Sequence, residues 1–337
     1  MLKVVYLILT HTNPEQILRL VKSLSSGNSA SRIVIHHSYS FSYLAPDAFE
    51  HFNNVHLVTN TVHVRWGDFS LTLAILRSIE WIKNNLEFDW LVLISGQDYP
   101  IQPPSQIEKF LETTNYDGFI RAAPLQRAIP CGDVECPVKS SDQRPCADCA
   151  TRYYYQYSDL PPFAYYHNLP TKLRNALERL TKHLNKMQSL FRIRHLPCRV
   201  DPRMKVGIRS YWTPFTDTFQ CNKGSTWFTI NNSCIQYLRH FIRNNPRFVR
   251  YYRNTIHPDE SFFGTILLNN SRLNISNDNK RFITWSSNKA PHPNILRKQD
   301  FHRIISSDQH FARKFDMNMD AEILNMIDQH IKIGNPF

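Results

Sequence analysis

The sequence predicts an α/β fold with a mixed, mostly parallel sheet covered by helices on both faces. Short segments of continuous apolar residues alternate with segments of helical periodicity, and 42% of the residues are hydrophobic. Continuous rather than alternating apolar strands are typical of a sheet that is buried on both sides. At 337 residues the chain is long enough for one large domain or two small ones.

The first third of the chain supplies this alternation. Strands are expected at residues 3–10, 32–36, 55–58 and 90–95, and helices at 14–24 and 70–85, with Ser70 as the N-cap of the second helix. Ligands of such sheets gather at the carboxyl ends of the strands. This rule places His11, His36 and residues 95–100 at a candidate site, although each is also an ordinary strand-end residue.

The middle of the chain has a different character. Residues 121–170 are rich in Pro, Cys and Tyr and are expected to form a long ordered excursion. After it, apolar residues recur every three or four positions, at Leu173, Leu177, Leu180, Leu184, Met187 and Phe191. This spacing predicts an amphipathic helix with a basic polar face. The favoured interpretation is a helix docked on the core by its leucines, and the alternative is a helix lying on anionic lipid.

The last third returns to regular structure. Strands are expected at residues 224–230 and 281–285, and helices at 233–244, 259–268 and 320–333. Neither a GxGxxG sequence nor a Walker A sequence occurs, so a glycine-rich phosphate loop is excluded.

The net charge of +12 is concentrated in one segment. Residues 171–210 contain eleven Lys or Arg and only two acidic residues, so they contribute +9 to the net charge of +12. Such a concentration favours an anionic partner, either a phosphate-bearing substrate, lipid headgroups or nucleic acid, unless it is simply a solvated helix face. We expect no nucleic-acid partner, because the segment lacks aromatics interleaved at a recognised motif.

Four of the seven cysteines lie close together, at Cys131, Cys136, Cys146 and Cys149. A reducing compartment would allow a four-cysteine zinc site, and an oxidising one would allow two disulfides. Only the closing C-x-x-C pair has the spacing of a zinc knuckle. Free thiols or a structural tie are therefore the favoured interpretation of the four cysteines, and a zinc site is the alternative.

Two segments contain residues suited to catalysis. Asp259 and Glu260 follow Pro258, which is good helix-capping chemistry, but the flanking aromatics suggest a carboxylate in a partly apolar cleft. Such a carboxylate can act as a general base. Arg313 and Lys314 lie between aromatics and could either stabilise a diphosphate leaving group or form an exposed ion pair with a neighbouring acid.

Five short blocks, in this order, resemble the core-2/I-branching N-acetylglucosaminyltransferase family, glycosyltransferase family 14, which also includes the peptide O-xylosyltransferases. They are Arg-Trp-Gly-Asp-Phe-Ser at 65–70, Ser-Gly-Gln-Asp-Tyr-Pro at 95–100, Gly-Ser-Thr-Trp-Phe at 224–228, Pro-Asp-Glu-Ser-Phe-Phe at 258–263 and Ala-Arg-Lys-Phe at 312–315. With the first strand, they cover almost the whole chain.

The resemblance implies a single GT-A-like domain over residues 1–337. Residues 1–125 would form the nucleotide-binding half, 126–220 the helical excursion and 221–337 the acceptor and catalytic half. The implied reaction is an inverting, metal-independent transfer of N-acetylglucosamine or xylose from a UDP-sugar to a hydroxyl of a glycan, protein or peptide. No cofactor is implied. An Asp-x-Asp metal motif is absent from the sequence, so fixed cations would have to replace a metal.

The same resemblance assigns roles to individual residues. Glu260 would be the catalytic base, Lys314 would neutralise the diphosphate, His11 would lie by the nucleotide and Trp285 would help form the acceptor site. Further candidates are Arg313 and Asp98 for the donor and Trp227 for the acceptor.

The chain departs from the family pattern at two places. Ser38 stands where branching enzymes have an aspartate near the uridine. No arginine aligns with their second phosphate ligand, for which Arg313, Arg297 or Lys289 could substitute.

Three further expectations concern the whole protein. The first ten residues have the pattern of a buried strand rather than of a targeting segment, so we expect a cytoplasmic, bacterial enzyme that rests on the inner membrane face through its basic helix. Within the family, peptide O-xylosyltransferase activity is an alternative. A non-catalytic module that binds glycan or anionic lipid is another, but such a module needs neither Glu260 nor Lys314.

Overall fold

The computed structural model describes residues 1–125, 147–161, 169–196, 202–286 and 292–333. Its largest element is a seven-stranded sheet in the order β11-β6-β10-β4-β1-β2-β3. The bounds are β1 Val4–Thr10, β2 Arg32–His37, β3 Val55–Leu57, β4 Trp90–Ser95, β6 Gly118–Pro124, β10 Asn222–Asn231 and β11 Ile275–Ser276. Strand β10 is antiparallel to both of its neighbours, and the other pairs are parallel.

Helices cover both faces of this sheet, because successive residues of a strand point to opposite sides. On one face Val4, Tyr6 and Ile8 pack with α1 (Pro14–Leu24), α3 (Pro104–Thr113) and α10 (Glu322–Ile333). On the other face, apolar residues of β1 pack with α2 (Ser70–Asn85), α6 (Asn232–Asn244), α7 (Pro246–Tyr252) and α8 (Phe262–Leu268). The predicted α/β class, with a mixed, mostly parallel sheet covered on both faces, is confirmed.

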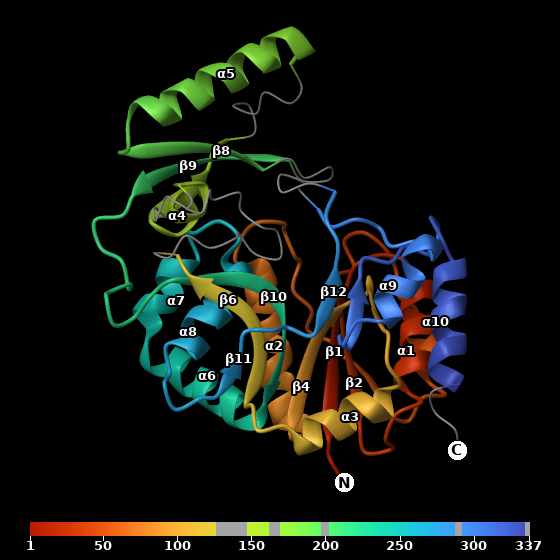
Figure 1. Cartoon of the computed structure of the whole chain (residues 1–337). Helices are drawn as coiled ribbons and strands as arrows, with labels where there is room; N and C mark the ends of the chain where they lie inside the picture. The colour runs from red at the N-terminus through yellow and green to blue at the C-terminus, as the bar shows by residue number, and fades with distance from the viewer. Residues whose placement is uncertain (126–146, 162–168, 197–201, 287–291, 334–337) are drawn as a thin grey trace.

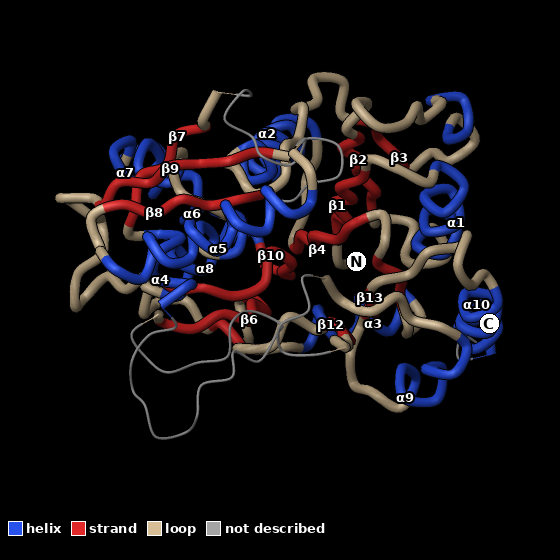
Figure 2. The backbone as a smooth tube through the Cα atoms, turned by 90° about the horizontal axis from the view of Figure 1, so that it is seen from above, coloured by secondary structure: helices blue, strands red, loops and turns tan. Residues whose placement is uncertain are grey.

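Two small sheets complete the fold. Strands β5 (Asp98–Pro100), β12 (Arg281–Ile283) and β13 (Phe311–Arg313) form one in the order β12-β13-β5, beside the short helix α9 (Phe301–Ile305). Strands β7 (Tyr155–Asp159), β8 (Phe191–Leu196) and β9 (Arg203–Arg209) form the other, in the order β7-β9-β8. Helices α4 (Ala147–Tyr153) and α5 (Thr171–Met187) accompany this second sheet, and α5 is the outermost element of the view (Figure 1). Seen from above, the second sheet lies over the β6–β10 side, away from α1 and α10 (Figure 2).

Most predicted elements are present, but three details differ. Ser70 is the first residue of α2 and not its N-cap. The backbone N–H of Ser70 donates a hydrogen bond to the carboxylate of Asp68 at 2.8 Å. The predicted helix at 259–268 is divided at Ser261 into a 3₁₀ turn, Pro258–Glu260, and α8. The strand predicted at 281–285 ends at Ile283.

The favoured interpretation of residues 171–187 is wrong. Helix α5 forms, but it contributes no buried residue and does not dock on the core. It rests on β8 through polar side chains, since the amide of Asn185 bonds to both backbone polar groups of Ile193. Among the described residues, no helix is long and apolar enough to cross a membrane.

Candidate active site

The carboxyl ends of β1 and β4, where the sequence predicts a candidate site, meet the segment that follows β13. The carboxamide of Gln16 joins them: it donates to the carbonyls of Gly96 at 2.8 Å and Phe315 at 3.1 Å. It also accepts from the backbone N–H of Met317 at 2.9 Å. Gln16 was not predicted from the sequence, although an amide among the apolar residues of one face of α1 is a signal for such a role. These bonds fix Lys314 at the strand ends.

Three nitrogen-bearing side chains gather around this point: Lys314, His11 and His292. Burial and the charge of Arg313 lower the pKa of Lys314. Burial lowers the pKa of His11, and the charges of His37 and Lys314 lower it further. Burial and Lys314 likewise lower the pKa of His292. Mutual repulsion among these groups indicates a site that favours an anion.

Arg313, next to Lys314, points into different surroundings. Its guanidinium lies 4.5 Å from the ring centroid of Trp227, and its Nε is 3.6 Å from Oδ1 of Asp98. The other oxygen of Asp98 accepts hydrogen bonds from the backbone and hydroxyl of Ser95. Asp98 is almost fully buried, so its contacts favour a role in holding Arg313. The register of β13 and β5 explains the pairing, because it sets Arg313 opposite Asp98.

Glu260 lies between two cations from distant parts of the chain. Its Oε2 is 3.0 Å from a guanidinium nitrogen of Arg152, on α4, and 3.2 Å from the ammonium of Lys223, on β10. Burial alone would raise the pKa of Glu260, but the charges of Lys223, Arg152 and His257 outweigh burial and lower it. Glu260 is therefore held as a carboxylate.

The neighbouring acid, Asp259, behaves in the opposite way. It is buried, and its Oδ2 accepts a hydrogen bond from the hydroxyl of Thr226 at 2.7 Å. Burial and the negative charge of Glu260 raise the pKa of Asp259. When the pair takes up a proton, Asp259 therefore binds it before Glu260 does.

The turn that carries Glu260 is held by the Arg-Trp-Gly-Asp block. His257 has a left-handed backbone with φ of 49°, and its N–H donates to the carbonyl of Gly67 at 3.0 Å. Gly67 has φ of 80°, and an added Cβ would lie 3.3 Å from the imidazole of His257. Buried Arg203 fixes the block from the other side, with bonds to the carbonyl of Trp66 and to Asp68. Two blocks that are far apart in sequence thus form one surface.

Trp66 connects the two halves of this site. Its ring lies edge-on to the imidazole of His257, with 4.5 Å between the centroids, and 6.5 Å from the imidazole of His292. A continuous path therefore runs from Glu260, through His257, Trp66 and His292, to Lys314. Of the residues on this path, only Glu260 and Lys314, at its two ends, were assigned roles from the sequence. The contacts of Arg152 and Lys223 with Glu260 could not be predicted from the sequence, because α4 and β10 are far from Glu260 along the chain.

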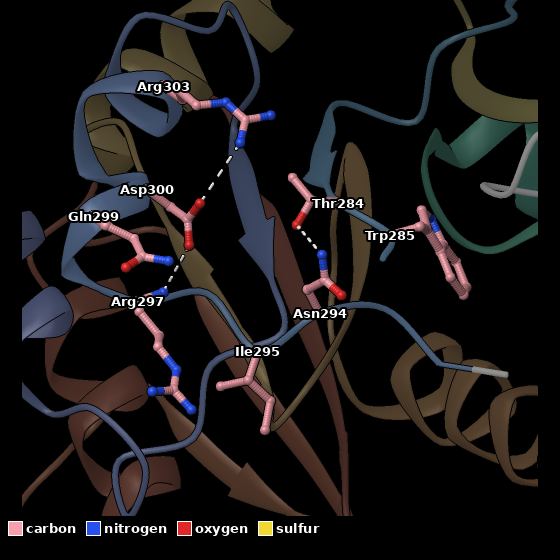
Figure 3. A pocket seen from close by; sticks show the side chains of 8 residues that line it. All are labelled: Thr284, Trp285, Asn294, Ile295, Arg297, Gln299, Asp300 and Arg303. Carbon is pink, nitrogen blue, oxygen red and sulfur yellow. Dashed lines mark hydrogen bonds and ion pairs between the residues drawn. The ribbon is translucent and has the colours of Figure 1, made fainter. Parts of the chain in front are cut away.

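Trp285 and Arg297 line a separate cavity of about 450 Å³ next to the backbone of Lys314 (Figure 3). The indole of Trp285 points away from the other side chains drawn there. The remaining lining residues are Thr284, Asn294, Ile295, Gln299, Asp300 and Arg303. Arg297 is therefore the candidate second phosphate ligand that faces open space, whereas Arg313 is engaged by Trp227 and Lys289 lies outside the described residues.

Several other sequence predictions concern residues away from this path. The imidazole of buried His36 accepts from the backbone of Val62, and the hydroxyl of Ser38 accepts from Val64, so both serve the local fold. The zinc alternative cannot be placed: Cys131, Cys136 and Cys146 lie outside the described residues, as does the side chain of Cys149.

Comparisons with known proteins identify the family to which the sequence is similar. The family model described as Core-2/I-Branching enzyme matches residues 4–124 and 167–307. The match includes four of the five blocks, whereas the block with Lys314 lies beyond its end and Arg152 lies in its gap.

Two curated relatives are similar over part of their length. Beta-glucuronosyltransferase GlcAT14B of Arabidopsis thaliana is 28% identical over 144 residues, which are 40% of this chain and 33% of that protein. Xylosyltransferase 2 of Homo sapiens is 29% identical over 130 residues, 32% of this chain and 14% of that protein. The chain thus matches a third or less of the length of these relatives.

Two solved structures are similar at a low level. The structure of S. aureus TarS 1–349 in complex with UDP-GlcNAc is 12% identical with a TM-score of 0.26, and the match covers 48% of this chain and 40% of TarS. HddC from Yersinia pseudotuberculosis is 18% identical with a TM-score of 0.25, covering 40% of this chain and 65% of HddC.

Proposed function

Because the chain belongs to the core-2/I-branching enzyme family, we propose that it is an inverting glycosyltransferase of GT-A-like fold that moves a sugar from a UDP-sugar to an acceptor hydroxyl without a metal ion. The observation that supports this most is the path from the clamped carboxylate of Glu260 to the cationic group around Lys314. A base and a leaving-group stabiliser at the two ends of one surface are what a direct displacement needs.

Glu260 acts as the general base in this proposal. Both Arg152 and Lys223 contact Oε2, so we assign Oε1 to the acceptor hydroxyl. Glu260 takes the hydroxyl proton as the acceptor oxygen forms a bond to the anomeric carbon. The bond from that carbon to the diphosphate breaks on the opposite side, so the configuration inverts and UDP leaves with the electron pair.

Lys314 stabilises the departing diphosphate, helped by His11 and His292. Their pKa values are lowered by burial and mutual repulsion, and a bound diphosphate would relieve that repulsion. Fixed cations in a partly buried site bind developing negative charge without reorganisation at the moment of reaction. Lys314 would supply charge that a divalent metal supplies in other sugar transferases, whereas the lowered pKa values of His11 and His292 favour neutral imidazoles, which can donate hydrogen bonds to the diphosphate.

The donor sugar is proposed from the family and from the relatives' names. N-acetylglucosamine and xylose follow from the family, and glucuronic acid follows from the name of the Arabidopsis relative. The acceptor is a glycan, or a protein or peptide if the activity is that of an O-xylosyltransferase. A non-catalytic binding module is disfavoured because it would need neither Glu260 nor Lys314, and the chain has both.

UDP release from UDP-N-acetylglucosamine, UDP-xylose and UDP-glucuronic acid tests the proposal, because slow transfer to water needs no known acceptor. We expect one donor to release UDP in the presence of EDTA. Release from none of them, together with absence of UDP binding, would refute the proposal.

A further inference from the structure

We propose that helix α5 and the hairpin beneath it dock the protein on an anionic lipid bilayer. The docking surface consists of the apolar stripe of α5, the exposed apolar residues of the β8–β9 hairpin and the basic residues around them. This surface is distinct from the proposed catalytic site, and its function does not depend on the reaction.

The apolar stripe of α5 contributes no buried residue, although Leu177 and Leu184 are half-buried. Leu173 and Leu180 are about half exposed, at 48% and 52%, and Met187 is 70% exposed. A helix places residues 173, 180 and 187 on one side. The helix meets β8 through a different side, that of Asn185 and the adjoining Gln188, which bonds to Phe191. Contact with β8 therefore leaves Leu173, Leu180 and Met187 accessible.

Exposed apolar groups continue beyond the helix. Leu190, between α5 and β8, is 72% exposed, and Ile208 on β9 is 67% exposed. Tyr211 and Trp212 follow β9 and are also exposed. Aromatic residues at the edge of an apolar surface are typical of the membrane–water interface. Helix α5 and the β8–β9 hairpin are the part of the molecule that stands furthest from the central sheet (Figure 1), whereas Trp212 packs back on Arg247 and Tyr251 of α7.

The positive charge of α5 indicates that its binding partner is anionic. The helix carries five basic residues and one acidic residue: Lys172, Arg174, Arg179, Lys182, Lys186 and Glu178. None of the five basic side chains forms an ion pair with another described residue. By contrast, Arg203 and Lys205 on β9 are buried and paired with Asp159. The free charge thus lies on the helix, around the apolar stripe.

Anionic lipid is the occupant that matches both properties. A leucine stripe inserts into the headgroup boundary while Lys and Arg bind anionic headgroups. A soluble polyanion would use the charges and leave the leucines in water. A second copy of the chain would bring two helices of the same positive charge together.

Flotation with vesicles tests the proposal. The intact protein is mixed with vesicles of phosphatidylcholine alone or with added phosphatidylglycerol. We expect binding only to the anionic vesicles. A basic residue near an anionic surface contributes on the order of fivefold to binding, so Arg179→Glu with Lys182→Glu should reduce it by about 25-fold or more. Lys22→Glu with Lys109→Glu is the matched control, because it makes the same charge change at exposed positions on α1 and α3.

A second pair of variants tests the leucines. Leu173→Gln with Leu180→Gln keeps the helix propensity and should reduce vesicle binding by about tenfold or more. Met319→Gln, at an exposed site that lies outside α5, is the control. Equal binding by the leucine variant and the wild type would overturn the proposal in favour of simple polyanion attraction. A lipid-free dimer that the leucine variant dissociates would overturn it in favour of a second copy.

Discussion

The ammonium of Lys223 lies 3.2 Å from Oε2 of Glu260. Strand β10, which carries Lys223, also carries Trp227, on which Arg313 stacks. This strand is antiparallel to β4 and β6, and its register shifts between Gly224 and Phe228. One irregular strand therefore positions the partner of the proposed base near its start and, four residues further on, the ring that contacts the residue next to Lys314.

Replacing Glu260 tests the assignment of the base. Glu260→Gln keeps the size of the side chain but removes its ability to accept a proton, so we expect kcat to fall by about 10²- to 10⁴-fold. UDP binding should change little, because Glu260 lies at the other end of the path from Lys314. Glu112→Gln, at an exposed position of α3, is the control. Unchanged UDP release by the Glu260 variant would remove Glu260 from the mechanism.

Lys314→Ala should impair both nucleotide binding and catalysis. Loss of a fixed cation at the leaving group costs about 10²- to 10³-fold in kcat. Calorimetric titration with UDP and UDP-release assays measure the two effects. Lys332→Ala, at an exposed position of α10, should behave as the wild type. If both lysine variants bind UDP equally well, the diphosphate lies elsewhere.

The lowered pKa of Glu260 predicts the acid limb of the pH–rate profile. A base with a lowered pKa stays ionised at high pH and is lost only when the pH falls through that lowered value. Activity should therefore persist below the usual range of glutamate. In Lys223→Met the main lowering charge is gone, so the acid limb of kcat/KM should move to higher pH. A limb that stays in place would show that Lys223 does not control Glu260.

A further prediction concerns the stability of the protein and the residue Gly224, which lies on β10. A Cβ at this position would lie 1.9 Å from the backbone oxygen of Arg121 and 2.4 Å from Cα of Ala122. Gly224→Ala should therefore force β6 and β10 apart and destabilise the protein by about 1–3 kcal/mol or more, measured by denaturant unfolding. Gly264→Ala is the comparison and should cost less, since its Cβ would lie 3.1 Å from the methyl group of Ala122 and 4.0 Å from Cβ of Asn222.

The local pattern of the chain was sufficient to predict most elements of the central sheet. Helix α1 and strand β4 have their predicted bounds, because their apolar residues and flanking turn residues are local signals. The position of β10 between β4 and β6 was not predictable in this way, because its pairing depends on residues that are distant in the sequence. The docking of α5 was mispredicted for a similar reason: a leucine stripe shows that a helix is amphipathic but not what it contacts.

The candidate site was predicted in part. The resemblance carried by the five blocks is confirmed by the family match, and the structure brings the blocks with Glu260 and Trp66 together. The partners of Glu260 could not be predicted, since Arg152 belongs to the Cys- and Tyr-rich excursion and Lys223 only precedes a block. The roles of Glu260, Lys314 and His11 in catalysis and donor binding, and that of Trp285 in acceptor binding, stay predictions.

Thermal unfolding in the presence of UDP, UDP-N-acetylglucosamine, UDP-xylose and UDP-glucuronic acid, each with and without EDTA, tests the central claim most directly. A ligand at about 100 times its dissociation constant stabilises the folded state by roughly 2.7 kcal/mol. We expect UDP to raise the unfolding temperature equally with and without EDTA, and one of the UDP-sugars to raise it further. A rise that EDTA abolishes would contradict metal independence, and no rise with any of the four would contradict the nucleotide-sugar site itself.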